Sequence, residues 1–127
     1  MKLNLLKQLP AKFQASHLEQ GHLAEQIAAT FLHQHGLILI EKNYRCKHGE
    51  IDLIMREGET LVFVEVRLRT NQDFGGAASS ITHSKQQKLS RAAALYLQTH
   101  GDCNCRFDAI LMQTTDLNAV EWIKNAF

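Results

Sequence analysis

Two neighbouring and largely apolar runs, residues 49–55 and 61–67, have the character of β-strands, and each also carries carboxylates. In the first run, the alternation of side chains along a strand places Glu50 and Asp52 on one side. The other side then carries the apolar residues Ile51, Leu53 and Met55. Both runs are apolar enough for a protein core, so the carboxylates within them need a chemical explanation.

The second run predicts two sides of different composition. One side carries Leu61, Phe63, Glu65 and Arg67, and the opposite side carries Val62, Val64, Val66 and Leu68. If residues 56–60 form the turn of a hairpin, Asp52 lies across from Glu65 or within one residue of it. Two acids and the cation of Arg67 are therefore expected to converge on one face of a sheet. Burying an unpaired carboxylate is costly, and a divalent metal ion is one of the few partners that satisfies several acids together.

Two helices are predicted outside these runs. Between residues 17 and 35, apolar side chains recur at helical spacing, and Gly36 stands where a C-terminal cap is expected. Their buried stripe consists of Ala24, Ile27, Ala28, Phe31 and Leu32. Thr82 is expected to cap a second helix that runs to about Thr99 and ends near Gly101. Its buried stripe consists of Leu89, Ala92, Ala93 and Tyr96.

The remaining segments complete an α/β pattern. Residues 37–44 and 106–112 have the composition of strands, and residues 120–127 form a short closing segment. The resulting order is helix, three strands, helix, strand, which predicts a mixed β-sheet flanked by helices. Residues 70–80, rich in glycine and small polar side chains, are expected to form a loop.

Length and composition agree with one globular domain. The 127 residues are enough to bury a core, and we assign the single domain to residues 17–127, after an N-terminal arm of uncertain order at residues 1–16. The chain has no apolar stretch long enough to cross a membrane and no signal-peptide pattern, so we expect a cytoplasmic protein without a membrane partner. The net charge of +1 provides no overall basic field, so nucleic acid would have to bind a local patch.

The three cysteines are expected to be reduced thiols, because their number is odd and nothing indicates secretion. They are Cys46, Cys103 and Cys105. Together with His100 they raise the question of a zinc site. Their spacing matches none of the usual paired-ligand patterns, so inert thiols are the preferred interpretation.

Two pairs of opposite charges also have a purely structural interpretation. Glu65 and Arg67, two residues apart, can form an ion pair of modest energy on one face. Asp108 follows Arg106 in a predicted strand and is interpreted as a salt-bridge partner inside the sheet. For Glu65 a metal site is preferred, because Asp52 adds a second carboxylate and clustered carboxylates repel unless something neutralises them.

With its elements in this order, the chain resembles the PD-(D/E)xK nuclease superfamily, and more closely the YraN-like family of small bacterial proteins. The matching stretches are residues 21–25, 49–54, 61–67, 85–89, 106–108 and 121–127. They cover nearly everything from about residue 20 to the end. Any one stretch alone is weak evidence, whereas the ordered set is specific. The resemblance implies a restriction-endonuclease-like fold.

The resemblance also implies a site for Mg²⁺ or Mn²⁺. By position in the motifs, Asp52 and Glu65 correspond to the metal ligands. Glu25, at the edge of the buried stripe of its helix, corresponds to an assisting helix acid, and Glu50 to a further ligand through water. Hard oxygen donors of this kind suit Mg²⁺, which keeps several of its waters.

The chain departs from the superfamily pattern at one catalytic position. Where the pattern has lysine, this chain has Arg67, which stays charged at any working pH and cannot act as a base. Lys85 projects in line with the buried stripe at the N-terminal end of the second helix. Three alternatives therefore remain open: Arg67 acts by its charge alone, Lys85 supplies the ammonium group, or the site is inactive.

The resemblance implies a nucleic-acid-binding protein, expected to be a metal-dependent nuclease that hydrolyses phosphodiester bonds in DNA, including branched or processed DNA. Beside such a site, Arg69, Lys88 and Arg91 would follow a nucleic-acid backbone without reading its sequence. The alternative is a catalytically inactive module that keeps the fold and binds nucleic acid or another partner. A third reading is an assembly protein that forms a homodimer through strand edges or through Trp122 and Phe127.

Overall fold

The computed structural model describes residues 17–69 and 81–127, so the expected arm at 1–16 and the expected loop at 70–80 lie outside the described residues. The elements are α2 (His17–Gln34), β1 (Ile38–Cys46), β2 (Gly49–Glu57), β3 (Thr60–Leu68), α3 (His83–His100), β4 (Cys105–Met112), the 3₁₀ helix η4 (Leu117–Ala119) and β5 (Val120–Ile123). Their order confirms the expected α/β class. The closing segment adds a short fifth strand to it.

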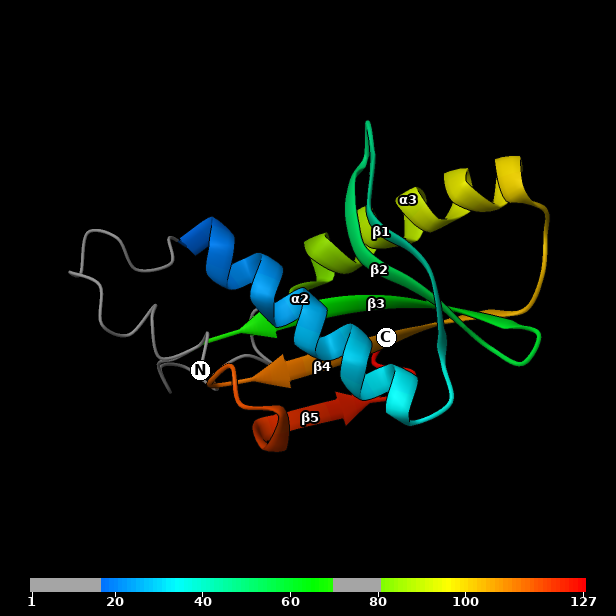
Figure 1. The fold of residues 1–127 in the computed structure, drawn as a ribbon. Coiled ribbons are helices and arrows are strands. Elements are labelled where there is room, and N and C mark those ends of the chain that lie inside the picture. The colour runs from blue at the N-terminus through cyan, green and yellow to red at the C-terminus, as the bar shows by residue number, and fades with distance from the viewer. Residues whose placement is uncertain (1–16, 70–80) are drawn as a thin grey trace.

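The strands form one mixed five-stranded sheet in the order β1-β2-β3-β4-β5 (Figure 1). Neighbouring strands are antiparallel except β3 and β4, which are parallel. A parallel pair needs a crossover connection, and α3 lies in the one between β3 and β4. The two helices pack on opposite faces of the sheet, because each contributes to a different apolar cluster.

The predicted helix ends are confirmed by their local geometry. Gly36 and Gly101, which follow α2 and α3, have φ angles of +94° and +99°, a conformation that favours glycine. The side chain of Thr82 accepts a hydrogen bond from the backbone N–H of Lys85 at 3.2 Å and so caps α3. No helix within the described residues is both long and apolar enough to cross a membrane.

Two apolar clusters, one on each face, hold the helices against the sheet. The cluster on the α2 face consists of Ala24, Ala28, Leu32, Leu37, Leu53, Met55, Val62, Val64, Ile110 and Met112. The cluster on the α3 face consists of Ile51, Ile54, Phe63, Leu89, Ala92, Ala93 and Tyr96. Both predicted helix stripes are confirmed, and so is the alternation of apolar side chains along β3.

The predicted alternation along β2 is wrong at one point. Ile51 packs on the α3 face, whereas Leu53 and Met55 pack on the α2 face, although the pattern places all three on one side. The reason lies where β2 changes partners: through Ile51 it pairs with β1 alone, and from Leu53 onward it also pairs with β3. Across from this point, Asn43 of β1 has a φ of +52°, in the left-handed region that interrupts a regular pleat.

The C-terminal segment packs back onto the chain around one buried carboxylate. Asp108 is 0% exposed. It accepts hydrogen bonds from Arg106 Nε at 3.0 Å, Trp122 Nε1 at 2.9 Å and the backbone N–H of Asn125 at 3.1 Å. The structural interpretation of Asp108 is thus confirmed. Trp122 and the C-terminal Phe127, which stacks on a ring of β4, make contacts within the chain, and a homodimer stays a prediction.

Candidate functional site

The carboxylates singled out in the sequence meet where β2 and β3 separate. The ladder between these strands extends from their turn as far as Leu53 and Val64, one residue short of Asp52 and Glu65. Beyond it, Asp52 Oδ2 accepts a hydrogen bond from the backbone N–H of Val66 at 2.8 Å. Asp52 therefore lies in the fork between the two strands and close to Glu65, as the expected register requires.

Asp52, Glu65 and Arg67 come together at the fork, and further groups reach the same place from both faces of the sheet. Glu25 comes from α2 on one face, Lys85 comes from α3 on the other, and both line the same cleft as Asp52. The cleft has a volume of about 460 Å³. Its lining consists of Gln20, Gly21, Ala24, Glu25, Asp52, Glu65, Val66, Arg67, Leu68, Arg69 and Lys85.

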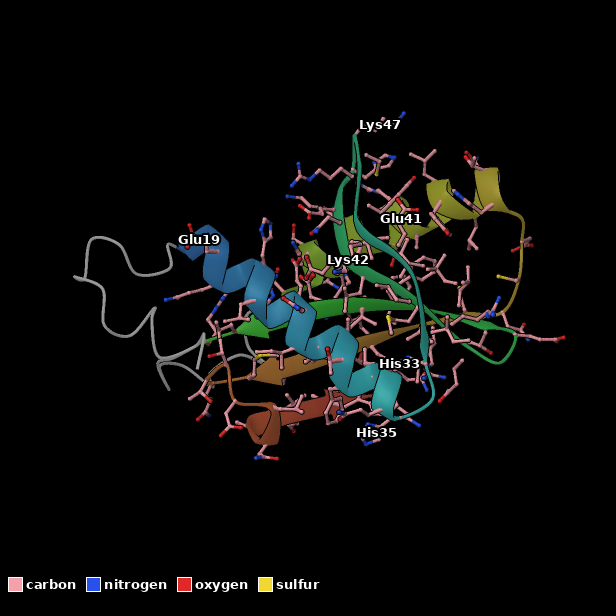
Figure 2. The ribbon with its side chains drawn as sticks, in the orientation of Figure 1. Glu19, His33, His35, Glu41, Lys42 and Lys47 are labelled. Atoms are coloured by element: carbon pink, nitrogen blue, oxygen red, sulfur yellow. The ribbon has the colours of Figure 1, made fainter. Side chains whose placement is uncertain are left out.

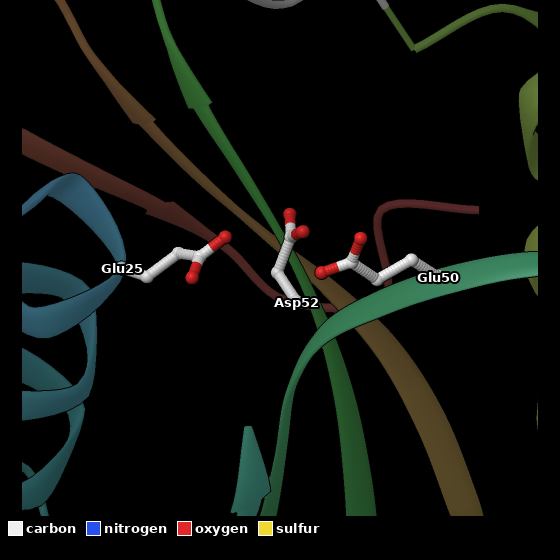
Figure 3. A group of neighbouring side chains, drawn as sticks. All are labelled: Glu25, Glu50 and Asp52. Atoms are coloured by element: carbon white, nitrogen blue, oxygen red, sulfur yellow. The ribbon is translucent and has the colours of Figure 1, made fainter. Parts of the chain in front are cut away.

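Three carboxylates approach one another closely here: Glu25 and Asp52 line the cleft, and Glu50 lies next to them. Glu25, Glu50 and Asp52 each place one oxygen within 4.8 Å of the others. Figure 3 shows Asp52 between the other two, with Glu25 reaching toward it from the helix. Across residues 17–69 and 81–127, this is the one group of three acidic, histidine or cysteine side chains spaced to hold a metal ion. It contains three of the four predicted metal ligands, and the fourth, Glu65, lies beside it.

Glu65 is held by two cations. It is 3% exposed, and its Oε2 lies 2.7 Å from Nη2 of Arg67 and 3.5 Å from Nζ of Lys85. Lys85 thus reaches the cleft from α3, as one of the three alternatives requires. Nε of Arg67 is buried and has no hydrogen-bond partner among the described residues.

Burial and neighbouring acids keep Asp52 protonated. Burial of the side chain, together with the Glu65 carboxylate beside it, raises the pKa of Asp52 from its ordinary value of 3.8 to about 9. The hydrogen bond from Val66 opposes this shift. Of the two neighbouring carboxyl groups, Asp52 carries the proton, because two cations, Arg67 and Lys85, already lie next to Glu65. Burial, and less strongly the charge of Glu50, also raises the pKa of Glu25.

The donor set of this group fits a hard divalent cation. All three members are carboxylates, and oxygen ligands of this kind suit Mg²⁺ and Mn²⁺ better than copper or zinc. Among the described residues Asp52 has no ion pair, and Glu50 has one long contact, with Arg45 at 3.5 Å. A cation between the carboxylates would therefore replace the proton of Asp52 and supply the positive charge that the chain itself does not place there.

The cations expected to follow a nucleic-acid backbone lie beside the cleft and on α3. Arg69 lines the cleft, whereas Lys88 and Arg91 are exposed on the helix beyond Lys85. The sequence of α3 contains Lys85, Lys88 and Arg91 and no acidic residue. Their placement suits an anionic ligand that extends from the cleft along α3.

Two neighbours of the carboxylates, Arg45 and Asn43, are not predicted from the sequence. The side chain of Arg45 is 72% exposed and lies next to Glu50. Asn43 forms a hydrogen bond with Glu25. Asn43 also lines a second groove of about 280 Å³ together with His22, Glu25, Gln26 and Lys42. The available signal for Asn43 is an asparagine inside a predicted strand, because asparagine tolerates the left-handed conformation better than most residues.

The raised pKa of Asp52 predicts a pH dependence of stability. Between about pH 4 and pH 9 the folded protein holds a proton on Asp52 that the unfolded chain releases, because the folded pKa is about 9 and the ordinary value is 3.8. The free energy of unfolding is therefore expected to fall as the pH rises through this range. Urea unfolding at pH 5.5 and pH 8.5 in a chelator checks this. Asp52→Asn should show a smaller fall than wild type, and an equal fall in both proteins would contradict the assignment.

Similar sequences fall into one family. The sequence profile described as "Uncharacterised protein family UPF0102" matches residues 24–112. A UPF0102 protein of Nitrosomonas europaea is 60% identical over 109 residues, which cover 85% of this chain and 92% of the relative. A UPF0102 protein of Nitrosospira multiformis is 57% identical over 109 residues, with the same coverage of both chains. One of Methylobacillus flagellatus is 52% identical over 107 residues, which cover 84% of this chain and 95% of the relative.

The fold and the cleft define a small α/β protein with a carboxylate-rich site between two helices. The chain belongs to the UPF0102 family, also described as YraN-like. The family resemblance noted in the sequence is thereby confirmed. The matched residues 24–112 include Glu25, Asp52, Glu65 and Lys85, so the family region contains the whole cleft except its lining residues at 20 and 21.

Proposed function

We propose that this protein binds nucleic acid and is a metal-dependent nuclease that hydrolyses phosphodiester bonds in DNA. The observation that carries the proposal is the convergence of Glu25, Glu50 and Asp52 within 4.8 Å of one another, next to a cleft that Glu25 and Asp52 line together with the cations of Arg67 and Lys85. A phosphate binder without a metal gains nothing from three carboxylates at the contact, because they repel the ligand. Carboxylates and cations together suit a metal ion and a phosphate bound side by side.

On this proposal, Glu25, Glu50 and Asp52 hold Mg²⁺ or Mn²⁺, with Glu65 beside them. A divalent ion in this position supplies Lewis-acid chemistry: it neutralises charge on the phosphodiester and makes an attacking water more acidic. Binding requires Asp52 to release its proton, which a cation at the carboxylate favours. The backbone N–H of Val66 then keeps the Asp52 carboxylate oriented in the fork.

The two cations of the cleft have separate tasks in the proposed reaction. Arg67 stays charged and presents that charge to the phosphate, while its Nη2 keeps Glu65 in place at 2.7 Å. Lys85 provides the ammonium group that the superfamily pattern places on the strand. Its side chain is 36% exposed, and its Nζ lies 3.5 Å from Glu65. The ammonium group can therefore reach a phosphate in the cleft and stabilise the negative charge that develops on it in the transition state.

Cleavage of labelled DNA tests the proposal. Wild-type protein is incubated with linear duplex, single-stranded and four-way-junction DNA, each with Mn²⁺ and with EDTA. The expected result is cutting of at least one substrate with Mn²⁺ and none with EDTA. The preferred substrate then identifies whether the protein acts on branched or processed DNA. Absence of cutting on all three, with DNA binding retained, would contradict the nuclease proposal.

A second candidate is a non-catalytic nucleic-acid-binding module. The observation that favours it is the engagement of Glu65 with Arg67 at 2.7 Å, because an arginine replaces the lysine of the superfamily pattern and occupies the expected metal ligand. Arg67→Lys separates the two candidates. Cutting by this variant alone would mean that the arginine inactivates an otherwise complete site, whereas absence of cutting in both proteins with retained binding supports the module.

A further inference from the structure

Beyond the fork, β1 and β2 continue as a two-stranded ribbon, residues 44–51. The paired residues in this stretch are Tyr44 with Ile51, Arg45 with Glu50 and Cys46 with Gly49, and β3 takes no part in it. Figure 1 shows the ribbon projecting away from the other strands of the sheet. Its base leads directly into Asp52 at the fork. The ribbon therefore sets the distance between a ligand bound at its tip and the carboxylates.

One side of the ribbon is anchored on α3. Tyr44 and Cys46 pack against the apolar cluster of the α3 face, and the ring of Tyr44 meets that of Tyr96 edge-on at 5.2 Å. A two-stranded hairpin alone is marginally stable in water, so this packing stabilises the ribbon. Because side chains alternate along a strand, Arg45 and its pairing partner Glu50 lie on the other side, together with the carboxylate group.

The tip of the ribbon is basic and its charges lack strong partners. Residues 45–48 include Arg45, Lys47 and His48 and no acidic residue. Lys47 is exposed at the outermost point of the ribbon (Figure 2) and forms no ion pair with any residue of 17–69 or 81–127. The ion pair of Arg45 with Glu50 is long, at 3.5 Å, and leaves the Arg45 side chain 72% exposed. Arg45 and Lys47 are thus exposed on a ribbon that is itself anchored on α3, and an anion can reach both.

We propose that Arg45 and Lys47 at the ribbon tip form a second contact for the phosphate backbone of the nucleic acid that the cleft receives. This inference rests on the proposed function. The ribbon packs on α3, which has Lys88 and Arg91 and no acidic residue. Arg45 lies on the side of the ribbon that carries the carboxylate group, so phosphates next to the one in the cleft can reach the ribbon tip.

The length of the ribbon indicates the size of the ligand. Asp52 and His48 are four residues apart in sequence (52 − 48), and a strand advances about 3.3 Å per residue, so the tip lies about 13 Å from the fork. Each strand of duplex DNA has one phosphate per about 3.4 Å of helix axis, so this distance corresponds to about four base pairs. The ligand is therefore a polynucleotide that extends about four nucleotides or more beyond the cleft.

Binding of a fluorescent 20-base-pair duplex tests the inference. Affinity is measured by anisotropy in Ca²⁺ over a series of salt concentrations for wild type and for Arg45→Ala/Lys47→Ala. We expect binding to weaken about tenfold or more and the salt slope to become shallower by about 1.8, since each lost phosphate contact accounts for about 0.9. The matched control, Arg56→Ala/Lys124→Ala, removes the same charge from exposed residues outside the ribbon and should bind like wild type.

The outcomes distinguish this inference from the function on which it rests. Equal affinity and equal salt slope in wild type and Arg45→Ala/Lys47→Ala overturn the ribbon contact and leave nucleic-acid binding standing. Failure of wild type to bind the duplex overturns both. The variant Arg45→Lys/Lys47→Arg keeps both charges and should bind the duplex as tightly as wild type. Weak binding by this charge-preserving variant as well would show that the loss comes from a disturbed hairpin, and would overturn the electrostatic contact.

Discussion

Asp52→Asn is expected to abolish metal-dependent cleavage of DNA without weakening the fold. In the metal-free protein Asp52 holds a proton, because its pKa is raised to about 9, so a neutral amide of the same shape preserves the structure. The amide oxygen can still accept the 2.8 Å hydrogen bond from Val66, but the side chain no longer supplies a charged ligand. Removing an outer partner of a metal ligand already costs 10–100-fold, so losing a direct ligand should lower the cleavage rate more than about 100-fold.

Three measurements on this variant separate metal binding from folding. Cleavage rates with Mn²⁺, Mn²⁺ affinity by calorimetry and Tm in a chelator are compared with those of wild type. Asp102→Asn, the same substitution at an exposed residue beyond the C-terminal end of α3, serves as the control and should behave like wild type. Cleavage at the wild-type rate by Asp52→Asn would refute the role of Asp52. A lowered Tm in the chelator would refute the protonated state assigned to it.

The elements of this fold are predictable because their signals are local. The cap at Thr82 and the glycine at Gly101 set the ends of α3, and spacing alone identifies its buried stripe. The proximity of Asp52 to Glu65 is also predictable, because a short turn fixes the register of an antiparallel pair. In each case the physical cause acts between residues close in sequence.

The alternation of β2 fails because its cause is not local. A strand keeps a regular period of two only while its pairing continues, and β2 gains β3 as a partner between Ile51 and Leu53. The left-handed Asn43 on the neighbouring strand falls at the same level. Neither event can be read from the β2 residues themselves. The break coincides with Asp52, so the irregular point of the sheet is also the point where the carboxylates gather.

The composition of the cleft likewise depends on tertiary packing. Glu25 and Lys85 enter it from helices on opposite faces, and their spacing in sequence says nothing about their distance from Asp52. The family resemblance brings Glu25 into the predicted set. Arg45 is absent from that set, although its pairing with Glu50 follows from the tight turn of the hairpin.

Asp52 and Asp108 show how a buried carboxylate with a structural role differs from a candidate ligand. Asp108 is neutralised from within: a guanidinium, an indole N–H and a backbone N–H all donate to it. Asp52 receives one backbone N–H, and no cation pairs with it among the described residues. The first arrangement is complete without a ligand, whereas the second becomes complete when a cation binds.

Asp108→Ala is therefore expected to destabilise the fold severely and to do so with or without metal. The substitution leaves the mostly buried Arg106 without its main partner and removes the acceptor that holds Trp122 and Asn125 of the C-terminal segment. Breaking a buried pair by removing one member costs about 3–5 kcal/mol, a large part of the stability of a small domain. Urea unfolding of wild type and variant measures the loss.

The other acid that contacts Arg106 provides the matched control for this prediction. Glu57 accepts a hydrogen bond from Arg106 Nη1 at 2.6 Å, but its side chain is 36% exposed, so water can replace the contact. Glu57→Gln is expected to cost about 1 kcal/mol or less. Similar losses in the two variants would mean that Asp108 is no more than an ordinary ion-pair partner. A large loss confined to Asp108→Ala would instead show that this carboxylate anchors the C-terminal segment.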